Sequence, residues 1–223
     1  MKKLKVGIVG ATCMVGQRFI MLLNEHPYFE ITALVAGPRS AGQKYGKAVL
    51  GRWKMTTPCP ENILNMEVLS SDDIETVGSL VDFVFCAVSL NKEETKALEE
   101  RYAKAEIPVV SNNSAHRWTP DVPMVIPEIN DSHLEVIEAQ RNRLGTKRGF
   151  IAVKPNCSIQ SYVPMLSALQ QFGIKEVIAT TYQAISGAGK TFNEWPEMVE
   201  NRIPYIGGEE EKSEKEPLRV WVR

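Results

Sequence analysis

The sequence predicts an α/β fold with a Rossmann-type doubly wound parallel sheet over residues 1–149. Short apolar runs alternate with segments of helical periodicity, which is the pattern of βαβ units. One of these runs, 81–88, is almost continuously apolar, as in a parallel strand that is covered on both faces. A glycine-containing turn joins the first run directly to a helical segment, which is typical of the opening unit of such a sheet.

Charge, hydropathy and cysteine content exclude several classes of protein. The formal net charge is -1, so the chain has no bulk electrostatic attraction to nucleic acid or to an anionic membrane. No apolar run approaches the ~18 residues of a membrane span, and the first residues lack the apolar segment of a signal peptide. The four cysteines have neither paired nor metal-ligand spacing, which predicts free thiols, no metal site and a reducing, cytoplasmic compartment.

The apolar run 4–9 predicts the first strand, and a helix with one apolar face follows the turn at 10–16. In a dinucleotide-binding domain this turn lets the backbone approach a pyrophosphate, which the helix N-terminus receives. The spacing of its glycines departs from plain GxGxxG, and Cys13 stands where a further glycine would help. A tight strand–helix turn without a cofactor is the alternative. We predict cofactor contacts from the whole turn: Gly10, Ala11, Thr12, Cys13, Met14, Val15 and Gly16.

The loop after the second predicted strand, 30–36, indicates the type of dinucleotide. An NAD site usually carries Asp or Glu here, which binds the ribose 2′-hydroxyl. This sequence instead has Arg39 and Ser40, a cation and a hydroxyl that suit a 2′-phosphate. The pattern therefore favours NADP over NAD, with a solvated loop arginine as the alternative.

The rest of the first domain contains two strands and two helices, predicted at 81–88, 91–105, 107–110 and 130–141. The polar residues 111–117 follow a strand at the edge where doubly wound sheets bind ligands. Arg117 in this loop is a candidate anion ligand, and a loop arginine without a ligand is the alternative. The glycine turn at 145–149 ends the domain, so we place the boundary after residue 149.

A cysteine follows the apolar run 150–153 and a proline, just before helical periodicity resumes. At a strand-to-helix junction, free backbone N–H groups and the helix dipole favour a thiolate and can also hold an oxyanion. Cys157 is therefore a candidate nucleophile. A small buried side chain in the core is the alternative.

Beyond Cys157, alternating side chains predict a long strand over 173–184. The following segment, 186–191, has the sequence SGAGKT, which is similar to the end of a P-loop. We exclude a P-loop, because position 184 is alanine where that motif needs glycine. The charged run 207–216 is typical of a solvated face, and the last residues, 219–223, have a strand-like pattern.

Taken together, these motifs resemble the aspartate-semialdehyde dehydrogenase family, in the family's order and over nearly the whole chain. The resemblance implies an NADP-linked, phosphate-dependent interconversion of L-aspartate 4-semialdehyde and 4-aspartyl phosphate. That reaction feeds lysine, methionine and threonine synthesis. The most specific feature is VKPNCSIQ followed by YQAISGAG. The matching stretches are GIVGATCMVG, GPRSAGQKYG, SNNSAHR, VKPNCSIQ, TTYQAISGAG and GGEEEKSEKEPL.

The resemblance implies that Cys157 is the nucleophile, which forms a thiohemiacetal and then, after hydride loss, a thioester. Asn156 and the Cys157 N–H would orient the substrate and stabilise the oxyanion. Gln183 matches the family's active-site glutamine. These three residues form the predicted catalytic group.

The resemblance also implies substrate and cofactor contacts. Arg117 and Lys212 would bind phosphate, and Glu209 would bind the substrate amine. The spacing of Glu209 and Lys212 puts both on one face if their segment is helical. Ser186 and Gly187 would join the first turn in binding the cofactor. The family further suggests a homodimer or homotetramer.

The family extends beyond residue 223 and supplies there a second substrate arginine and a general acid/base histidine. His26, His116 and His133 all precede Cys157, and none stands in that histidine's context. We therefore interpret the sequence as a C-terminally truncated chain, in which 150–223 is an incomplete α+β substrate and dimerisation domain. Exposed apolar surface and an open sheet edge then predict aggregation of the chain alone.

Two alternatives to this function remain open from the sequence. One is a related cysteine enzyme that reduces another acyl phosphate or thioester, such as N-acetylglutamyl phosphate or malonyl-CoA. The other is a non-catalytic NADP-binding fragment, in which Cys157 would be shielded and unreactive.

Overall fold

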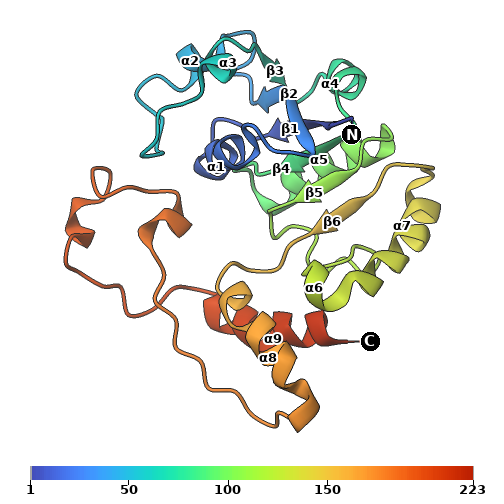
Figure 1. The fold of residues 1–223 in the computed structure, drawn as a ribbon, viewed down its shortest axis with the longest axis vertical. Helices are drawn as coiled ribbons and strands as arrows, with labels where there is room; N and C mark the ends of the chain where they lie inside the picture. The colour runs from blue at the N-terminus through green and yellow to red at the C-terminus, as the bar shows by residue number, and fades with distance from the viewer. Residues whose placement is uncertain (1, 223) are drawn as a thin grey trace.

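A computed structural model describes residues 2–222, and a six-stranded parallel sheet forms its first part (Figure 1). The strand order is β3-β2-β1-β4-β5-β6, so the chain winds outward from β1 in both directions. This order confirms the predicted doubly wound α/β fold. The strands are β1 Leu4–Val9, β2 Phe29–Ala36, β3 Val68–Ser70, β4 Phe83–Cys86, β5 Val109–Ser111 and β6 Ile151–Val153.

Helices cover both faces of this sheet. They are α1 Met14–Leu23, α2 Tyr45–Ala48, α3 Glu61–Leu64, α4 Ile74–Leu80, α5 Lys92–Lys104, α6 Pro127–Asn130, the 3₁₀ turn η1 Asp131–Val136, and α7 Ile137–Leu144. Alternation along β1 sends Ile8 to one face, where it shares a buried cluster with Ile20 of α1. Val9 points to the other face and shares a second cluster with Leu98 of α5. Each face of the sheet thus has its own core.

Local signals explain where several helices begin and end. Asn91 and Glu94 form a reciprocal capping box, which confirms the predicted start of α5. The helix predicted at 130–141 is instead divided into α6, η1 and α7. The division occurs at Asn130, whose buried side chain bonds two backbone groups of the preceding segment. The last of these helices ends at Gly145, which has a left-handed φ of 73°.

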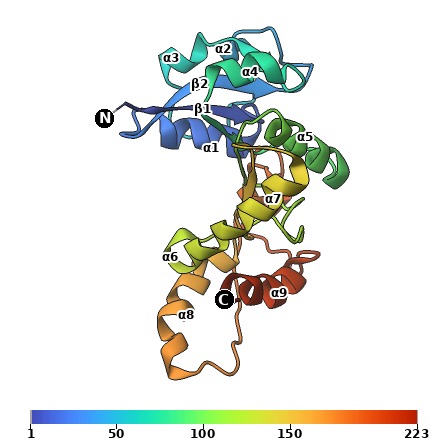
Figure 2. The same ribbon diagram turned by 90° about the vertical axis from the view of Figure 1, so that its right-hand side faces the viewer.

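Residues 154–222 form a second part that extends away from the sheet (Figure 2). Its elements are η2 Ile159–Ser161, α8 Val163–Leu169, η3 Gln170–Phe172, η4 Ile185–Ala188, η5 Pro196–Met198 and α9 Glu209–Trp221. Helix α9 returns to the first part, because Val220 is 1% exposed and lies in the same buried cluster as Val9. Arg219 adds hydrogen bonds to the carbonyls of Thr119 (2.9 Å) and Val122 (3.0 Å).

The strand predicted at 173–184 is not formed. The segment pairs with no described strand, and Ile178 is 91% exposed. Alternation describes two faces of a strand, but a strand is stable only when its backbone N–H and C=O groups have partners. The pattern is therefore present without the pairing that would make it a strand.

The predicted strand-like pattern at 219–223 is also wrong. The described part of this segment continues helix α9 as far as Trp221. Pro217, Val220 and Trp221 repeat at helical spacing and turn toward the core. Glu216, which was assigned to a solvated charged run, is 1% exposed.

The sheet also continues past the predicted domain boundary after residue 149. Strand β6 pairs in parallel with β5, with Ala152 opposite Val110. A boundary after residue 149 would therefore leave β6 outside the domain that contains the rest of the sheet. The last strand of this sheet ends at Val153.

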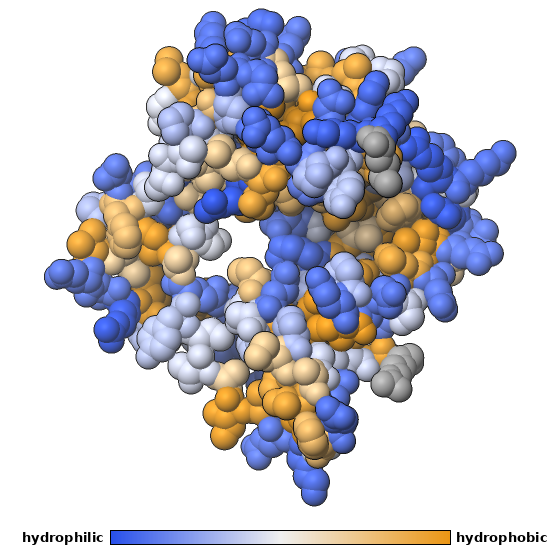
Figure 3. Space-filling view, viewed as in Figure 1, coloured by the Kyte–Doolittle hydropathy of each residue, from blue (hydrophilic) through white to orange (hydrophobic). Residues whose placement is uncertain are grey.

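The second part encloses little of its own apolar surface. A space-filling view shows an opening between the loop that carries η4 and η5 and the rest of the molecule (Figure 3). Phe172 and Tyr182 are 77% and 87% exposed.

Among the helices at residues 2–222, none combines the length and apolar character needed to cross a bilayer.

Candidate active site

Three loops that bear predicted site residues leave the same edge of the sheet. They follow β1, β5 and β6, which all run in parallel, so their carboxyl ends lie at one edge. The order of strands reverses between β1 and β4, which places a crevice at the ends of these two strands.

The glycine turn after β1 sits at this crevice and needs its glycines. Gly10 has a φ of 90°, and a Cβ there would lie 2.4 Å from the carbonyl oxygen of Ala87, just after β4. A Cβ on Gly16 would lie 2.2 Å from the carbonyl oxygen of Gly10. Helix α1 begins at Met14 without a side-chain cap, so its first N–H groups are directed to the turn. This is the geometry in which a helix N-terminus receives a phosphate.

Two buried side chains that the sequence did not identify support the turn. The Tyr45 hydroxyl donates to the carbonyl of Ala11 at 2.8 Å. Gln17 is fully buried; it donates to the carbonyl of Arg52 at 2.9 Å and accepts from the N–H of Lys54 at 2.7 Å. In the sequence, the only sign of their role is that each is an uncharged polar side chain at a position expected to be buried.

Cys13 is compatible with an anion at this turn. Burial raises the pKa of its thiol, against smaller opposing effects of Ser89, Arg52 and Lys54. The side chain therefore stays neutral near pH 7 and puts no negative charge beside a pyrophosphate.

The two residues predicted to bind a 2′-phosphate differ in their exposure. Arg39 is exposed after β2, whereas Ser40 is buried. The Arg52 guanidinium, from beyond α2, donates to the Ser40 hydroxyl at 3.3 Å, so a second cation that the motif did not reveal lies against this loop.

Cys157 lies in the turn after β6 and is exposed, which rules out the buried alternative for this residue. Its neighbours Asn156 and Ser158 are buried. Asn156 Oδ1 accepts hydrogen bonds from the Ser158 N–H (2.8 Å) and hydroxyl (2.5 Å). The helical periodicity predicted beyond Cys157 is confirmed by α8, which begins at Val163 after the short η2. The thiol is thus presented by a fixed loop.

Glu209 at the start of α9 brings several predicted residues together. Its carboxylate accepts hydrogen bonds from Lys212 (2.6 Å), Gln183 (2.9 Å) and Asn156 Nδ2 (3.1 Å). Burial acts to raise the pKa of Glu209, but the bonds from Lys212 and Gln183 outweigh it and lower the pKa. The carboxylate is therefore charged at neutral pH.

Arg117 is buried rather than free in its loop. Its guanidinium pairs with Glu216 of α9 at 3.1 Å and donates to the carbonyl of Lys154 at 3.1 Å. Burial, followed by the charge of Arg117, lowers the pKa of Lys154, while Cys157 and Glu216 oppose the shift. Glu216 and Lys154 are site residues that the sequence did not identify.

The predicted cofactor residues Ser186 and Gly187 lie apart from this cluster. Both are exposed in η4, on the loop beyond the extended segment. The loop contacts the first part through Lys54, which donates to the carbonyl of Gly189 at 2.6 Å and pairs with Glu194 at 2.8 Å.

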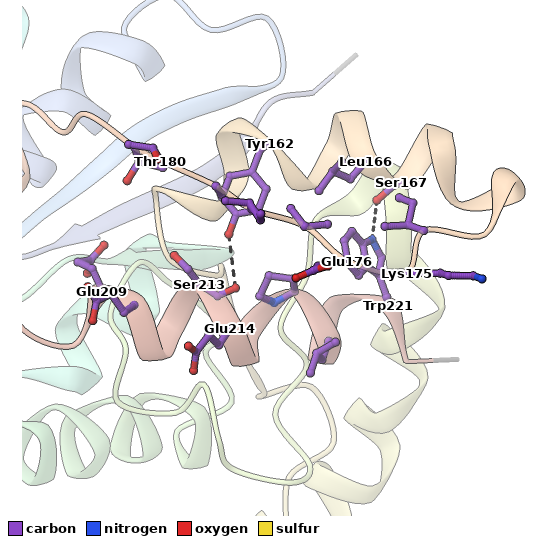
Figure 4. A pocket seen from close by; sticks show the side chains of 18 of the residues that line it. Tyr162, Leu166, Ser167, Lys175, Glu176, Thr180, Glu209, Ser213, Glu214 and Trp221 are labelled. Carbon is purple, nitrogen blue, oxygen red and sulfur yellow. Dashed lines mark hydrogen bonds between the residues drawn. The ribbon is translucent and has the colours of Figure 1, made fainter.

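A cavity of about 1300 Å³ lies between α8, the extended segment and α9 (Figure 4). Glu209 and Gln183 are among its lining residues, and Cys157 is not. Two hydrogen bonds join its walls: the Tyr162 hydroxyl, just before α8, donates to the carbonyl of Ser213 in α9, and the Trp221 indole N–H of α9 donates to the Ser167 hydroxyl in α8. Glu209 and Gln183 therefore form part of the wall of this cavity.

Residues 5–137 match the family model described as semialdehyde dehydrogenase, NAD binding domain. The chain belongs to the semialdehyde dehydrogenase family. The match covers the sheet as far as α7 and includes the glycine turn and the loop of Arg117.

Relatives of this family are similar to nearly the whole chain. An aspartate-semialdehyde dehydrogenase of Methanothermobacter thermautotrophicus is 44% identical over 218 residues, which are 96% of this chain and 60% of that protein. One of Aspergillus fumigatus is 43% identical, over 98% of this chain and 59% of that protein. The crystal structure of the Candida albicans enzyme with NADP has a TM-score of 0.78 and 39% identity, covering 95% of this chain and 58% of that one. The chain thus spans about 60% of the length of these relatives.

Proposed function

We propose that this chain carries the cofactor-binding and nucleophile-bearing parts of an NADP-dependent, phosphate-dependent aspartate-semialdehyde dehydrogenase. The main support is the exposed Cys157 between two buried and hydrogen-bonded neighbours, Asn156 and Ser158. Relatives of that name support the choice of substrate. The sheet through β6 would bind the cofactor, and residues from 154 onward would complete the substrate site.

The glycine turn fits a dinucleotide. Gly10 and Gly16 allow a close backbone turn that a Cβ would block, and the uncapped N–H groups at the start of the ten-residue helix α1 would receive a pyrophosphate. Arg39 would hold a 2′-phosphate, with Arg52 behind it on Ser40. Bound NADP would supply the hydride acceptor for the oxidation.

Cys157 would begin the reaction by adding its thiolate to the aldehyde carbon. The sulfur–carbon bond forms, and the carbonyl electron pair moves to oxygen. The Cys157 N–H and the Asn156 side-chain amide are the donors that would stabilise this oxyanion. Loss of hydride leaves a thioester on Cys157. Attack of phosphate on the thioester carbon breaks the sulfur–carbon bond, releases the acyl phosphate and returns the thiolate.

The charged groups around Cys157 suit the two ends of this substrate. The Glu209 carboxylate, ionised at neutral pH, would bind the substrate ammonium group. Arg117 and Lys212 would bind phosphate, and Gln183, held by Glu209, would orient the substrate.

Each described histidine is engaged away from Cys157. His116 bonds to Thr119, His133 bonds to Asn130, and His26 stacks on Phe29. Because a positioned general base contributes about 10²–10⁴-fold, we expect slow turnover when the proton of the thiohemiacetal passes to water.

The chain would work in a reducing compartment such as the cytoplasm, where its four free thiols persist. Assembly as a homodimer or homotetramer through the second part would cover its exposed apolar side chains.

The test is NADPH formation from NADP and aspartate semialdehyde, with and without phosphate, on the 223-residue chain and on Cys157→Ala. The proposal expects slow, phosphate-dependent turnover that vanishes in Cys157→Ala, and competition only from analogues with a free amine. Turnover that survives in Cys157→Ala would contradict it, as would a preference for an N-acetylated substrate.

A further inference from the structure

Glu216 is a buried carboxylate at the centre of the candidate site. It lies on α9 two turns after Glu209, on the same face of the helix, and is 1% exposed. Charged carboxylates are seldom buried without partners, and each oxygen of Glu216 has one. Oε1 accepts from the Arg117 guanidinium at 3.1 Å, and Oε2 accepts from the N–H of Asn156 at 2.5 Å.

Asn156 is consequently held at both of its ends by one helix. Glu216 binds its backbone N–H and Glu209 binds its side-chain amide, while its Oδ1 holds the backbone and hydroxyl of Ser158. Cys157 lies between these two fixed residues and is the only exposed residue of the loop from 155 to 159. The position of the thiol therefore depends on α9.

The second partner of Glu216 gives it an electrostatic effect as well. Arg117 is a permanent cation, and its pairing with Glu216 neutralises it within the site. An anion that binds Arg117 must compete with Glu216, and any shift of Glu216 acts directly on the Asn156 peptide beside Cys157.

We propose that Glu216 is a positioning residue that fixes the Asn156 peptide next to Cys157 and holds Arg117 neutralised until an anionic group enters the site. This rests on the proposed function, in which Cys157 is the nucleophile and Arg117 meets phosphate. Glu216 thereby links the anion subsite to the nucleophile loop.

The experiment measures the alkylation of Cys157 by iodoacetate, an anion, and by iodoacetamide, which is neutral. Peptide mass spectrometry assigns the label to Cys157, which is exposed, rather than to Cys13, Cys59 or Cys86, which are less so. The 223-residue chain is compared with Glu216→Gln and with the matched control Glu214→Gln, which removes the same charge from an exposed position on α9. Neither NADP nor aspartate semialdehyde is needed, so the result is independent of whether the proposed activity is found.

Glu216→Gln is expected to raise the ratio of the iodoacetate to the iodoacetamide rate about three- to tenfold, because Arg117 is no longer neutralised. Inorganic phosphate should slow the iodoacetate reaction at about tenfold lower concentration than in the unmodified chain. Both effects should vanish in the double variant Arg117→Met/Glu216→Gln. A folded Glu216→Gln with the same ratio as Glu214→Gln would overturn the proposal.

Loss of a partner from a buried ion pair is strongly destabilising, so Glu216→Gln can fail to fold. Hydrogen exchange of the unmodified chain covers that case. The Asn156 N–H, which donates to Glu216, should exchange more slowly than the N–H of Cys157, which makes no hydrogen bond among the described residues. Exchange of the Asn156 N–H as fast as that of Cys157 would overturn the proposal.

Discussion

The two parts of this molecule are held together in different ways. In residues 2–153 the strands pair in parallel, so their backbone N–H and C=O groups have partners, and a core is buried on each face of the sheet. Residues 154–222 contain no described strand and leave side chains such as Phe172 and Ile178 exposed. The second part is fixed to the first by polar contacts of α9 and by three buried side chains in the shared core, Ile159, Val163 and Val220. The candidate site therefore lies where a rigid frame meets a segment attached by a few buried side chains and specific hydrogen bonds.

The largest contrast between the two parts is expected in amide hydrogen exchange. Strands β1 and β4 lie inside the sheet, whereas the backbone of 174–184 is extended and pairs with no described strand. We expect the strand amides to exchange at least about 10⁴-fold more slowly than those of 174–184. Mass spectrometry of exchange in peptides measures both. Equal protection would mean that 174–184 pairs in solution, through another copy or another segment.

Within the frame, the glycine turn should be highly sensitive to substitution. Gly10→Ala places a Cβ against the Ala87 carbonyl at a positive φ, and we expect a loss of about 2–4 kcal/mol in unfolding free energy. Gly37→Ala is the control, because a Cβ there meets nothing within 4 Å, and it should change stability by less than about 0.5 kcal/mol. Urea denaturation of both variants measures the two free energies of unfolding. Equal stabilities would show that the turn relaxes and that its glycines are dispensable to the frame.

The attachment of α9 should respond to a smaller apolar change. Val220→Ala removes buried methyl groups from the shared core and should cost about 2 kcal/mol. It should also speed exchange of the Asn156 N–H, since Glu216 is on the same helix. Val222→Ala, at an exposed position, is the control. If α9 were attached by polar bonds alone, the two variants would behave alike.

The smallest effect concerns the frame's buried histidine. Burial lowers the pKa of His116, although Glu99 opposes the shift. A folded-state pKa below the unfolded value of about 6.5 means that the unfolded chain binds more protons, so stability falls as pH drops below about 6.5. An NMR titration of the His116 imidazole measures the midpoint directly. A midpoint above that of a free histidine would reverse the sign.

Much of the frame was predictable because its signals are local. The run 4–9, the turn at Gly10 and the capping box at Asn91 each specify their own conformation, and parallel strands of one chain find their partners nearby. The spacing of Glu209 and Lys212 likewise predicted that both lie on one face of a helix, and the structure shows them there as an ion pair.

The residues that the sequence did not reveal act through distant contacts. Glu216 looks like any glutamate in a charged run, and only the fold brings it to Arg117, 99 positions away. Gln17 and Tyr45 support the turn in the same way. The predicted strand at 173–184 failed for the converse reason, since alternation says nothing about whether a pairing partner is present.

The central claim is that Cys157 forms the covalent bond to the substrate. The most direct measurement is mass spectrometry of the chain after incubation with NADP and aspartate semialdehyde in the absence of phosphate. We expect an aspartyl thioester on the Cys157 peptide, formed only with NADP present and removed when phosphate is added. A chain that binds NADP yet carries no adduct, or carries it on Cys13, Cys59 or Cys86, would contradict the account.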